Sequence, residues 1–428
     1  MNTTQLKNII NEGKLDEKLI ALYGESSLSL QKERYLKAVD SFVSIYGDYE
    51  NVGIYSVPGR SELSGNHTDH NAGCVIASSI DLDVIAVAAR VDGTVIKIKS
   101  EGYPEDVVDI TEYTKPDSSK FATSAAIIAG MSEGLTKQGY ASGGFVAYTT
   151  SNVLKGSGLS SSAAFEVMVG NLISHLYNDG KIDNIEIAKT AQYAENQFFG
   201  KPCGLMDQVA CANGGIVAID FAEAGNPIIE PISFDISGAG YALCITDTGG
   251  NHADLTDDYA AVPAEMKAVA AALGADLLRR TSKEALLANI ERVRKECGDR
   301  AVLRAFHFFN ENERVALQKE ALINGDIYRF FSYVIGSGRS SYCYLQNVYT
   351  TKNVHEQGLS LALCLAENYM DGKTGAFRVH GGGFAGTIQA FVELEDVEGF
   401  RATMDSAFGE GKCMVLRVRQ QGAVKVID

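Results

Sequence analysis

NVLKGSGLSSSAAFEVMVGNLI, residues 152–173, is the stretch that decides the fold. A strand-like run ends at Thr150, a loop rich in glycine and serine follows, and helical spacing of apolar residues begins at the serines. Such a loop presents backbone N–H groups at the positive end of a helix dipole, and Gly156 and Gly158 lack the Cβ atoms that would block a phosphate. A glycine turn with one serine N-cap is the alternative interpretation. Three consecutive serines exceed what one cap needs, so we predict an anion-binding cradle.

The segments on either side of this loop mix strand-like and helix-like patterns. β-Branched or alternating runs predict strands at residues 51–57, 74–90, 94–100, 143–150, 214–220 and 241–248. Spacing of three and four predicts helices at residues 159–177, 185–199, 205–211, 254–324 and 354–370, before strands return near the C-terminus. The pattern predicts a mixed α/β chain with a β-rich first half.

Residues 226–240 hold two of the seven prolines and several glycines, which is typical of a junction. We therefore predict an N-terminal domain over residues 1–225 and a C-terminal domain over residues 240–428.

Composition narrows the class of partner. The 428 residues include 38 Lys and Arg against 54 Asp and Glu, a formal net charge of −16, and no basic run occurs. Nucleic acid and anionic membrane surfaces are therefore not expected as partners. No signal-like segment or apolar stretch of about 18 residues is present, so we expect a cytoplasmic location. Eight scattered cysteines without a CxxC pair predict buried, reduced thiols.

Two familiar nucleotide motifs fail on inspection. The GKT at residues 372–374 has Glu367 where a P-loop requires glycine. The GxGxxG match at residues 381–386 is followed by the strand-like run TIQAFVEL, where a dinucleotide fold requires a helix. We reject both a Walker A motif and a Rossmann site.

A second segment, VPGRSELSGNHTDHNAGCVIA at residues 57–77, concentrates polar side chains between two predicted strands. Within twelve residues it holds Arg60, Glu62, Asn66, His67, Asp69, His70 and Asn71. This density suits a polyhydroxylated ligand, each hydroxyl of which needs a hydrogen-bond partner. A solvated loop and a metal site are the alternatives, the latter weakened by the absence of an evident third ligand.

A third segment, QYAENQFFGKPCGLMDQVACANGG at residues 192–215, carries two carboxylates. Asp207 lies in an apolar context, where an unpaired carboxylate is costly, so it needs a partner or a role. A helix N-cap is the other explanation for Asp207, and a solvent-facing position is the other explanation for Glu195.

Together these segments resemble the GHMP small-molecule kinases and, within them, the galactokinases, over nearly the whole chain. PGRSELSGNHTDHNAG is similar to the galactokinase signature, GSGLSSSAA to the phosphate-binding motif, AENQFFGKPCGLMDQ to the catalytic segment and HGGGFAG to the C-terminal glycine motif. The resemblance implies a two-domain α/β fold. Its N-terminal domain would be like the second domain of ribosomal protein S5, and its C-terminal domain would be a GHMP αβ domain.

The resemblance also implies roles for individual residues. Asp207 would accept the proton of the sugar C1 hydroxyl, with Arg60 as its partner, and Ser162 and Glu195 would hold Mg²⁺. The ATP phosphates would lie against Gly156, Ser157, Gly158, Leu159, Ser160, Ser161, Ser162 and Ala163. The sugar would contact Asn66, His67, Asp69, Gly204 and Tyr259.

The sequence departs from the family pattern in the sugar segment. Asn66 stands where the family has Glu and His70 where it has Tyr, while Leu154 and Ala385 replace a Pro and a Gly. An amide both donates and accepts, so recognition of the sugar must change in detail there.

The function implied is Mg²⁺-dependent phosphorylation of galactose at C1 by ATP, giving galactose 1-phosphate and ADP. We expect a monomer, with an oligomer as the alternative. A kinase for N-acetylgalactosamine, arabinose or a uronic acid is the alternative that Asn66 and His70 leave open. A non-catalytic galactose and ATP sensor is a further alternative, which the intact Ser162 and Ala163 disfavour.

Overall fold

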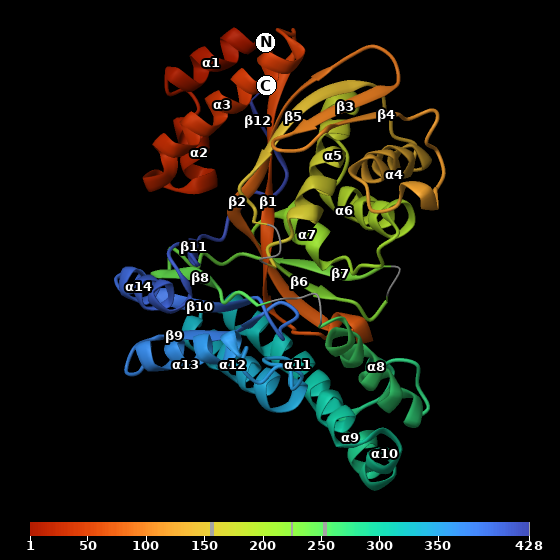
Figure 1. Cartoon of the computed structure of the whole chain (residues 1–428), viewed down its shortest axis with the longest axis vertical. Coiled ribbons are helices and arrows are strands. Elements are labelled where there is room, and N and C mark those ends of the chain that lie inside the picture. The colour runs from red at the N-terminus through yellow and green to blue at the C-terminus, as the bar shows by residue number, and fades with distance from the viewer. Residues whose placement is uncertain (155–157, 224–225, 251–254, 428) are drawn as a thin grey trace.

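Two long antiparallel strands, β1 (Val52–Ser64) and β2 (Cys74–Arg90), run through the middle of the molecule (Figure 1). The structure is a computed structural model, and it describes residues 1–154, 158–223, 226–250 and 255–427. The larger sheet has the order β12-β1-β2-β5-β3-β4, and β6 and β7 extend it beside the first half of β2. Its other strands are β3 (Val95–Ser100), β4 (Glu105–Asp109), β5 (Phe145–Ser151), β6 (Ile216–Asp220), β7 (Ile228–Ile232) and β12 (Val424–Ile427).

Helices cover both faces of this sheet, because successive side chains of β2 point to opposite sides. Ala86 and Ala88 pack against one layer, which consists of α4 (Ser124–Lys137), α5 (Ser161–Tyr177), α6 (Asn184–Tyr193) and α7 (Met206–Asn213). Ile85 and Val87 pack against the other layer, which consists of α1 (Thr3–Asn11), α2 (Asp16–Tyr23) and α3 (Leu28–Tyr46). The two layers lie on either side of the sheet in the upper half of Figure 1.

The smaller sheet is antiparallel with the order β11-β8-β10-β9. Its strands are β8 (Tyr241–Asp247), β9 (Gly375–His380), β10 (Thr387–Glu393) and β11 (Cys413–Leu416). α13 (Gly358–Tyr369) and α14 (Val397–Phe408) cover one face. The remaining helices are α8 (Thr256–Ala272), α9 (Lys283–Ala288), α10 (Ile290–Cys297), α11 (Asp299–Ile323) and α12 (Ile327–Ser340).

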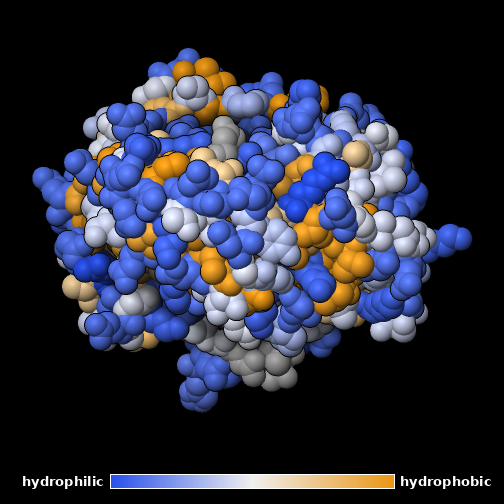
Figure 2. All heavy atoms as spheres, turned by 90° about the horizontal axis from the view of Figure 1, so that it is seen from above, coloured by the Kyte–Doolittle hydropathy of each residue, from blue (hydrophilic) through white to orange (hydrophobic). Residues whose placement is uncertain are grey.

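One hydrophobic cluster joins the two sheets. It combines Leu63 and Ile76 of the larger sheet with Leu243 of the smaller one and with Val334 of α12, all buried. Because side chains from both sheets share this core, the loops at the ends of β1 and β9 are held against each other. On the face seen from above, hydrophilic residues predominate and apolar ones are scattered among them (Figure 2).

Most of the predicted elements are confirmed. β1, β2, β3, β5, β6 and β8 occupy the predicted positions, and the strand predicted after the GxGxxG match is β10. The predicted helix at 185–199 is α6 followed by a π-helical turn, Ala194–Phe199.

Two expectations were wrong. The first half was predicted to be β-rich, but it begins with three helices, α1, α2 and α3, that were not predicted. All eight cysteines are free, but only Cys211, Cys244 and Cys413 are buried. Cys343 and Cys364 are exposed, because they lie on the outer faces of helical turns, and the other three are partly buried.

The predicted domain division stays a prediction. β7 lies inside the proposed junction and pairs with β6, while β12, from the end of the chain, pairs with β1 in the larger sheet. Among the described residues, no helix is long and apolar enough to cross a membrane.

Candidate functional site

Asp207 and Arg60 form the centre of the candidate site. Asp207 lies in the first turn of α7, and Arg60 lies on β1 at an irregularity in its pairing with β2. The guanidinium binds the carboxylate through two hydrogen bonds, Nε to Oδ1 and Nη2 to Oδ2, each 2.7 Å. This two-point geometry fixes the carboxylate plane and makes the pair stronger than a single contact.

The same pair joins the phosphate loop to α7. The Ser160 hydroxyl donates to Asp207 Oδ2, and Arg60 Nη1 donates to the carbonyl of Gly158. The backbone N–H of Arg60 donates to the carbonyl of Leu159 at 3.1 Å. Arginine, carboxylate and loop therefore form one connected unit.

The electrostatics keep Asp207 ionised. Burial raises the pKa of Asp207, but the Arg60 guanidinium and the Ser160 hydroxyl outweigh burial, and the net pKa lies below its usual value. With 32% of its side chain exposed, Asp207 is still reachable from solvent. The site therefore offers an accessible carboxylate anion at neutral pH.

The described part of the phosphate loop has the backbone that a close approach requires. Gly158 has φ +71° and Ser160 has φ +57°, both left-handed. α5 begins at Ser161, so Ser162 and Ala163 lie in its first turn, and its dipole points its positive end at the loop. Gly156 and Ser157 lie outside the described residues.

Two buried carboxylates, Glu166 on α5 and Glu195 on the π-helical turn after α6, share one amide partner. Gln208 Nε2 donates to Oε2 of Glu195 at 3.0 Å and to Oε2 of Glu166 at 3.1 Å, and all three side chains are buried. Lys201 Nζ lies 3.2 Å from Oε1 of Glu195. Burial and the neighbouring Glu195 raise the pKa of Glu166 to about 8.

This arrangement fits a divalent cation. Ser162 and Glu166 are four residues apart on α5 and therefore share a face of the helix, and Gln208 joins Glu166 to Glu195. In the described part of the chain, no group of three or more His, Cys, Asp or Glu side chains is placed so that it could hold a metal ion by itself. Mg²⁺ commonly takes one or two carboxylates and completes its shell with substrate phosphates and water.

A cavity of about 230 Å³ opens beside the Arg60–Asp207 pair. Its walls are Arg60, Glu62, Asn66, His67, Asp69, His70, Cys203, Gly204, Met206, Asp207, Gly381 and Gly382. A Cβ atom on Gly204 would lie 3.2 Å from Oδ2 of Asp69, so a bare backbone leaves room at this point. The structure thus brings both predicted catalytic residues and four predicted sugar contacts to one cavity.

Tyr259, the fifth predicted sugar contact, lies behind the glycine turn that follows β9. Its hydroxyl donates to the carbonyl of Gly383 at 2.7 Å, and a Cβ atom on Gly382 would lie 2.7 Å from its ring. Burial raises the pKa of Tyr259 to about 12.

Sequence reasoning missed three residues of this region. Glu166 was hidden within the apolar pattern of α5, although its spacing from Ser162 was a usable signal. His380 binds Thr387 Oγ1 at 2.8 Å and Ser61 Oγ at 3.1 Å, while Asn347 reaches the site from a loop after α12. Neither has a local sequence signal, because only the packing of the two sheets places them here.

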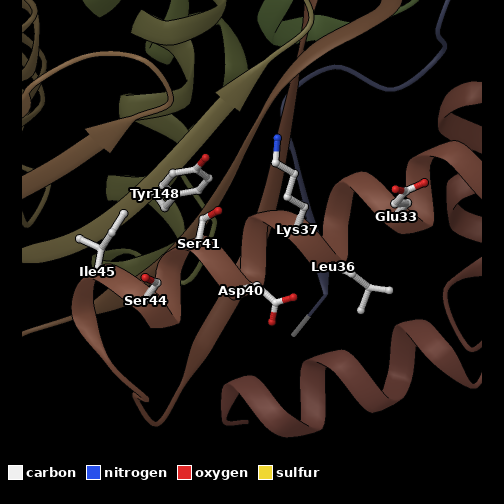
Figure 3. Close-up of a pocket in the computed structure, with 8 residues that line it drawn as sticks. All are labelled: Glu33, Leu36, Lys37, Asp40, Ser41, Ser44, Ile45 and Tyr148. Atoms are coloured by element: carbon white, nitrogen blue, oxygen red, sulfur yellow. The ribbon is translucent and has the colours of Figure 1, made fainter.

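A separate groove runs along α3, lined by Glu33, Leu36, Lys37, Asp40, Ser41, Ser44, Ile45 and Tyr148 (Figure 3). Tyr148 packs with the α1–α3 layer, whereas Asp207 belongs to the α4–α7 layer. The groove is therefore distinct from the candidate site.

Comparison with known proteins agrees with this geometry. The model of the galactokinase galactose-binding signature matches residues 40–90, and the model of the GHMP kinase N-terminal domain matches residues 121–215. The chain is 31% identical over 383 residues to a galactokinase of Streptomyces coelicolor, an alignment that covers 89% of this chain and 94% of the relative. The chain belongs to the galactokinase family.

Other galactokinases support this membership. A galactokinase of Lactococcus lactis is 26% identical over 396 residues, covering 90% of this chain and 94% of that one. The crystal structure of Lactococcus lactis galactokinase complexed with galactose superposes with a TM-score of 0.75 at 25% identity, covering 91% of this chain and all of that chain. A mevalonate kinase structure, at 14% identity and a TM-score of 0.60, shares the fold and confirms the expected GHMP architecture.

Proposed function

We propose that the protein transfers the γ-phosphoryl group of ATP to the C1 hydroxyl of galactose, giving galactose 1-phosphate and ADP. The observation that carries this proposal is the Arg60–Asp207 pair. It binds the phosphate loop on one side and forms the wall of the sugar-sized cavity on the other. Family membership supports a sugar kinase, and the match of the galactose-binding signature supports galactose as the acceptor.

Asp207 would orient the acceptor hydroxyl and take its proton. A carboxylate whose pKa is lowered is a weak base, so it acts mainly as a hydrogen-bond acceptor until the hydroxyl oxygen begins to bond to phosphorus. Only then does the hydroxyl proton become acidic enough to move to Asp207. Phosphoryl transfer requires little covalent chemistry from the protein itself, so positioning the acceptor hydroxyl would be the main contribution of Asp207.

Arg60 would serve both partners of the reaction. Its guanidinium holds Asp207 in one orientation and lies against the carbonyl of Gly158 in the phosphate loop. From this place its positive charge faces the charge that develops between donor and acceptor. The backbone N–H groups at the start of α5 would bind the phosphates.

Ser162 and Glu195 would hold Mg²⁺. When bound, the ion would neutralise phosphate charge on ATP. Gln208 would keep the Glu195 carboxylate in a fixed orientation, because its amide donates to that carboxylate from below.

The test is ADP release by the purified protein with MgATP, measured with and without galactose. The proposal predicts release that depends on galactose and saturates with it. Release that is equally fast without sugar, or that needs another sugar from a panel including N-acetylgalactosamine, arabinose and galacturonate, would contradict it.

A further inference from the structure

The glycine turn after β9 accepts hydrogen bonds from the side chains around the sugar cavity. Its three successive carbonyls, at residues 381, 382 and 383, face donors from the loop after β1, from α8 and from the loop after α12. The bonds are Asn66 Nδ2 to Gly381 at 2.6 Å, His67 Nε2 to Gly382 at 2.9 Å, Asn347 Nδ2 to Gly382 at 3.2 Å and Tyr259 Oη to Gly383 at 2.7 Å. Three of the predicted sugar contacts are therefore tied to one turn of the other sheet.

Asn66 has no hydrogen-bonding capacity left for a ligand. Its Nδ2 donates to Gly381 and to Oε1 of Glu62 at 3.3 Å. Its Oδ1 accepts from Asn347 Nδ2 at 2.8 Å and from Ser341 Oγ at 3.3 Å. An amide side chain has two donor hydrogens and two acceptor lone pairs, so all four positions are used.

The chemistry of the partners fixes the orientation of this amide. The Gly381 carbonyl can only accept, so the atom that faces it must be the nitrogen of Asn66. Glu62 is bound by Arg378, which leaves its Oε1 facing Asn66 as an acceptor too. A carboxylate in place of the Asn66 amide would set acceptor against acceptor at both contacts, and burial makes such a mismatch costly.

The turn also sets the state of His67. Because the Gly382 carbonyl can only accept, the hydrogen of the neutral ring lies on Nε2, and Nδ1 is an acceptor. Nδ1 is buried and has no hydrogen-bond partner among the residues that the structure describes. Burial, and the nearby His70, lower the pKa of His67 to about 4, so the ring stays neutral.

The backbone at His67 has a strained conformation. Its φ is +58°, a left-handed conformation that costs energy for a non-glycine residue and persists where surrounding contacts impose it. His307 contributes such a contact, with its Nε2 lying 2.9 Å from the backbone carbonyl of Asn66.

We propose that Asn66 is a positioning residue and not a sugar ligand. Together with Asn347, Asn66 holds the glycine turn at residues 381–383 against the loop that carries His67. The turn then fixes the His67 ring so that Nδ1 can accept a hydrogen bond from a ligand hydroxyl. This inference rests on the proposed function, because it assigns the cavity to a sugar. It goes further because it assigns Asn66 and Asn347 the role of positioning the turn, and His67 Nδ1 the role of accepting a hydrogen bond from a ligand hydroxyl.

The test compares Asn66→Asp with Asn347→Asp. Asn347 is fully buried and does not belong to the cavity wall, so a direct contact with sugar cannot explain an effect of its replacement. Both variants should raise KM for galactose by about tenfold or more, the effect of losing one or two buried hydrogen bonds. KM for ATP should stay within about threefold of the parent value, because the phosphate loop is not part of this network. Asn368→Asp, the same change on the exposed side of α13, is the matched control and should leave both constants unchanged.

The outcomes separate the two roles. An increase in KM for galactose with Asn66→Asp alone would show that Asn66 contacts the sugar directly, and would overturn the proposal. Equal effects on KM for galactose and for ATP would show a general structural role and would also overturn it. A parent protein that is inactive with galactose at every concentration defeats the proposed function itself, which is a different result.

A measurement on the parent protein avoids variants that fail to fold. Nitrogen-15 NMR of the histidine rings, with the His67 signals assigned by their loss in His67→Gln, reports which ring nitrogen carries hydrogen. The proposal predicts the Nε2–H form without sugar and a shift of the Nδ1 signal on addition of galactose. An Nδ1–H form, a charged ring or an unchanged Nδ1 signal would overturn it.

Discussion

Two sets of residues at the same cavity use opposite chemistry: a charged set, Asp207 and Arg60 in its wall, and a neutral set, Asn66 in the wall and Asn347 behind it. Asp207 and Arg60 form an ion pair with 32% and 11% of their side chains exposed. Asn66 and Asn347 are fully buried, and they bind backbone carbonyls and each other without forming an ion pair. The difference teaches that the pair proposed to react needs charge that a substrate can reach. The pair proposed to position the sugar contacts needs a fixed geometry that solvent and substrate cannot disturb.

The largest effect should come from breaking the charged set. Arg60→Met removes both bonds to Asp207 and the bond to the phosphate loop, so we expect kcat to fall by about 10³-fold, as for the loss of a preorganised charge. Steady-state ADP release measures this. Arg60→Lys is the control, because it keeps the charge but not the two-point geometry, and it should recover part of the loss. Activity of Arg60→Met close to that of the parent would place the charged set outside the reaction.

A second change tests whether Glu195 is a ligand of the Mg²⁺ ion proposed to bind near the charged set. Glu195→Gln should raise the Mg²⁺ concentration that gives half-maximal activity by about tenfold to 100-fold, because a carboxylate ligand becomes neutral. The titration is made at fixed ATP and saturating galactose. Glu186→Gln, on α6, where the carboxylate binds Tyr140 instead, is the matched control and should not alter the Mg²⁺ requirement. Identical Mg²⁺ curves for Glu195→Gln and the parent would exclude Glu195 as a ligand.

His380 lies between the two sets, and its neutral state gives a dependence on pH. Burial, and the positive charges of Arg60 and Arg378, lower the pKa of His380 to about 3. The unfolded chain takes up this proton near pH 6.5, so the stability that depends on the neutral ring is complete above that pH and is lost as the pH falls towards 3.

The matching variant is His380→Gln, which cannot take up the proton. The free energy of unfolding of the parent, relative to that of this variant, should fall by about 2 kcal/mol between pH 7 and pH 5. Urea unfolding at the two pH values measures the difference. A difference that does not change with pH would show that His380 is not held neutral.

The smallest effect should come from Ser160→Gly. Glycine tolerates the left-handed backbone at this position, so the change removes the hydroxyl that donates to Asp207 with little strain. Loss of one hydrogen bond to a carboxylate that keeps its arginine should lower kcat by about fivefold. A loss as large as that of Arg60→Met would mean that the hydroxyl, and not the guanidinium, organises Asp207.

Part of the charged set could be foreseen from local signals in the sequence, whereas the pairing of Arg60 with Asp207 was implied only by the resemblance to the family. Glycines and serines before an apolar helix predicted the phosphate loop, and the apolar surroundings of Asp207 required a partner for its charge. The mixture of strand and helix patterns likewise predicted a mixed α/β chain, whereas the two-domain GHMP architecture was implied by the resemblance.

The neutral set could not be foreseen, because its members meet only through the packing of the two sheets. Asn66 lies 281 positions from Asn347 and 315 positions from Gly381 in the turn at residues 381–383, and none of these groups has a charge that demands a partner. Asn66 was expected to meet the sugar, whereas its amide is saturated by protein groups. α3 was not predicted either, and its apolar side chains pack against the sheet and against α1 and α2.

The position of the transferred phosphoryl group tests the central claim most directly. After reaction of galactose with MgATP, phosphorus-31 and carbon-13 NMR of the product identify the esterified oxygen. If Asp207 orients the anomeric hydroxyl toward the phosphate loop, all the new phosphate is bonded to the C1 oxygen. Phosphate on another hydroxyl, or inorganic phosphate in place of a sugar ester, would contradict the account.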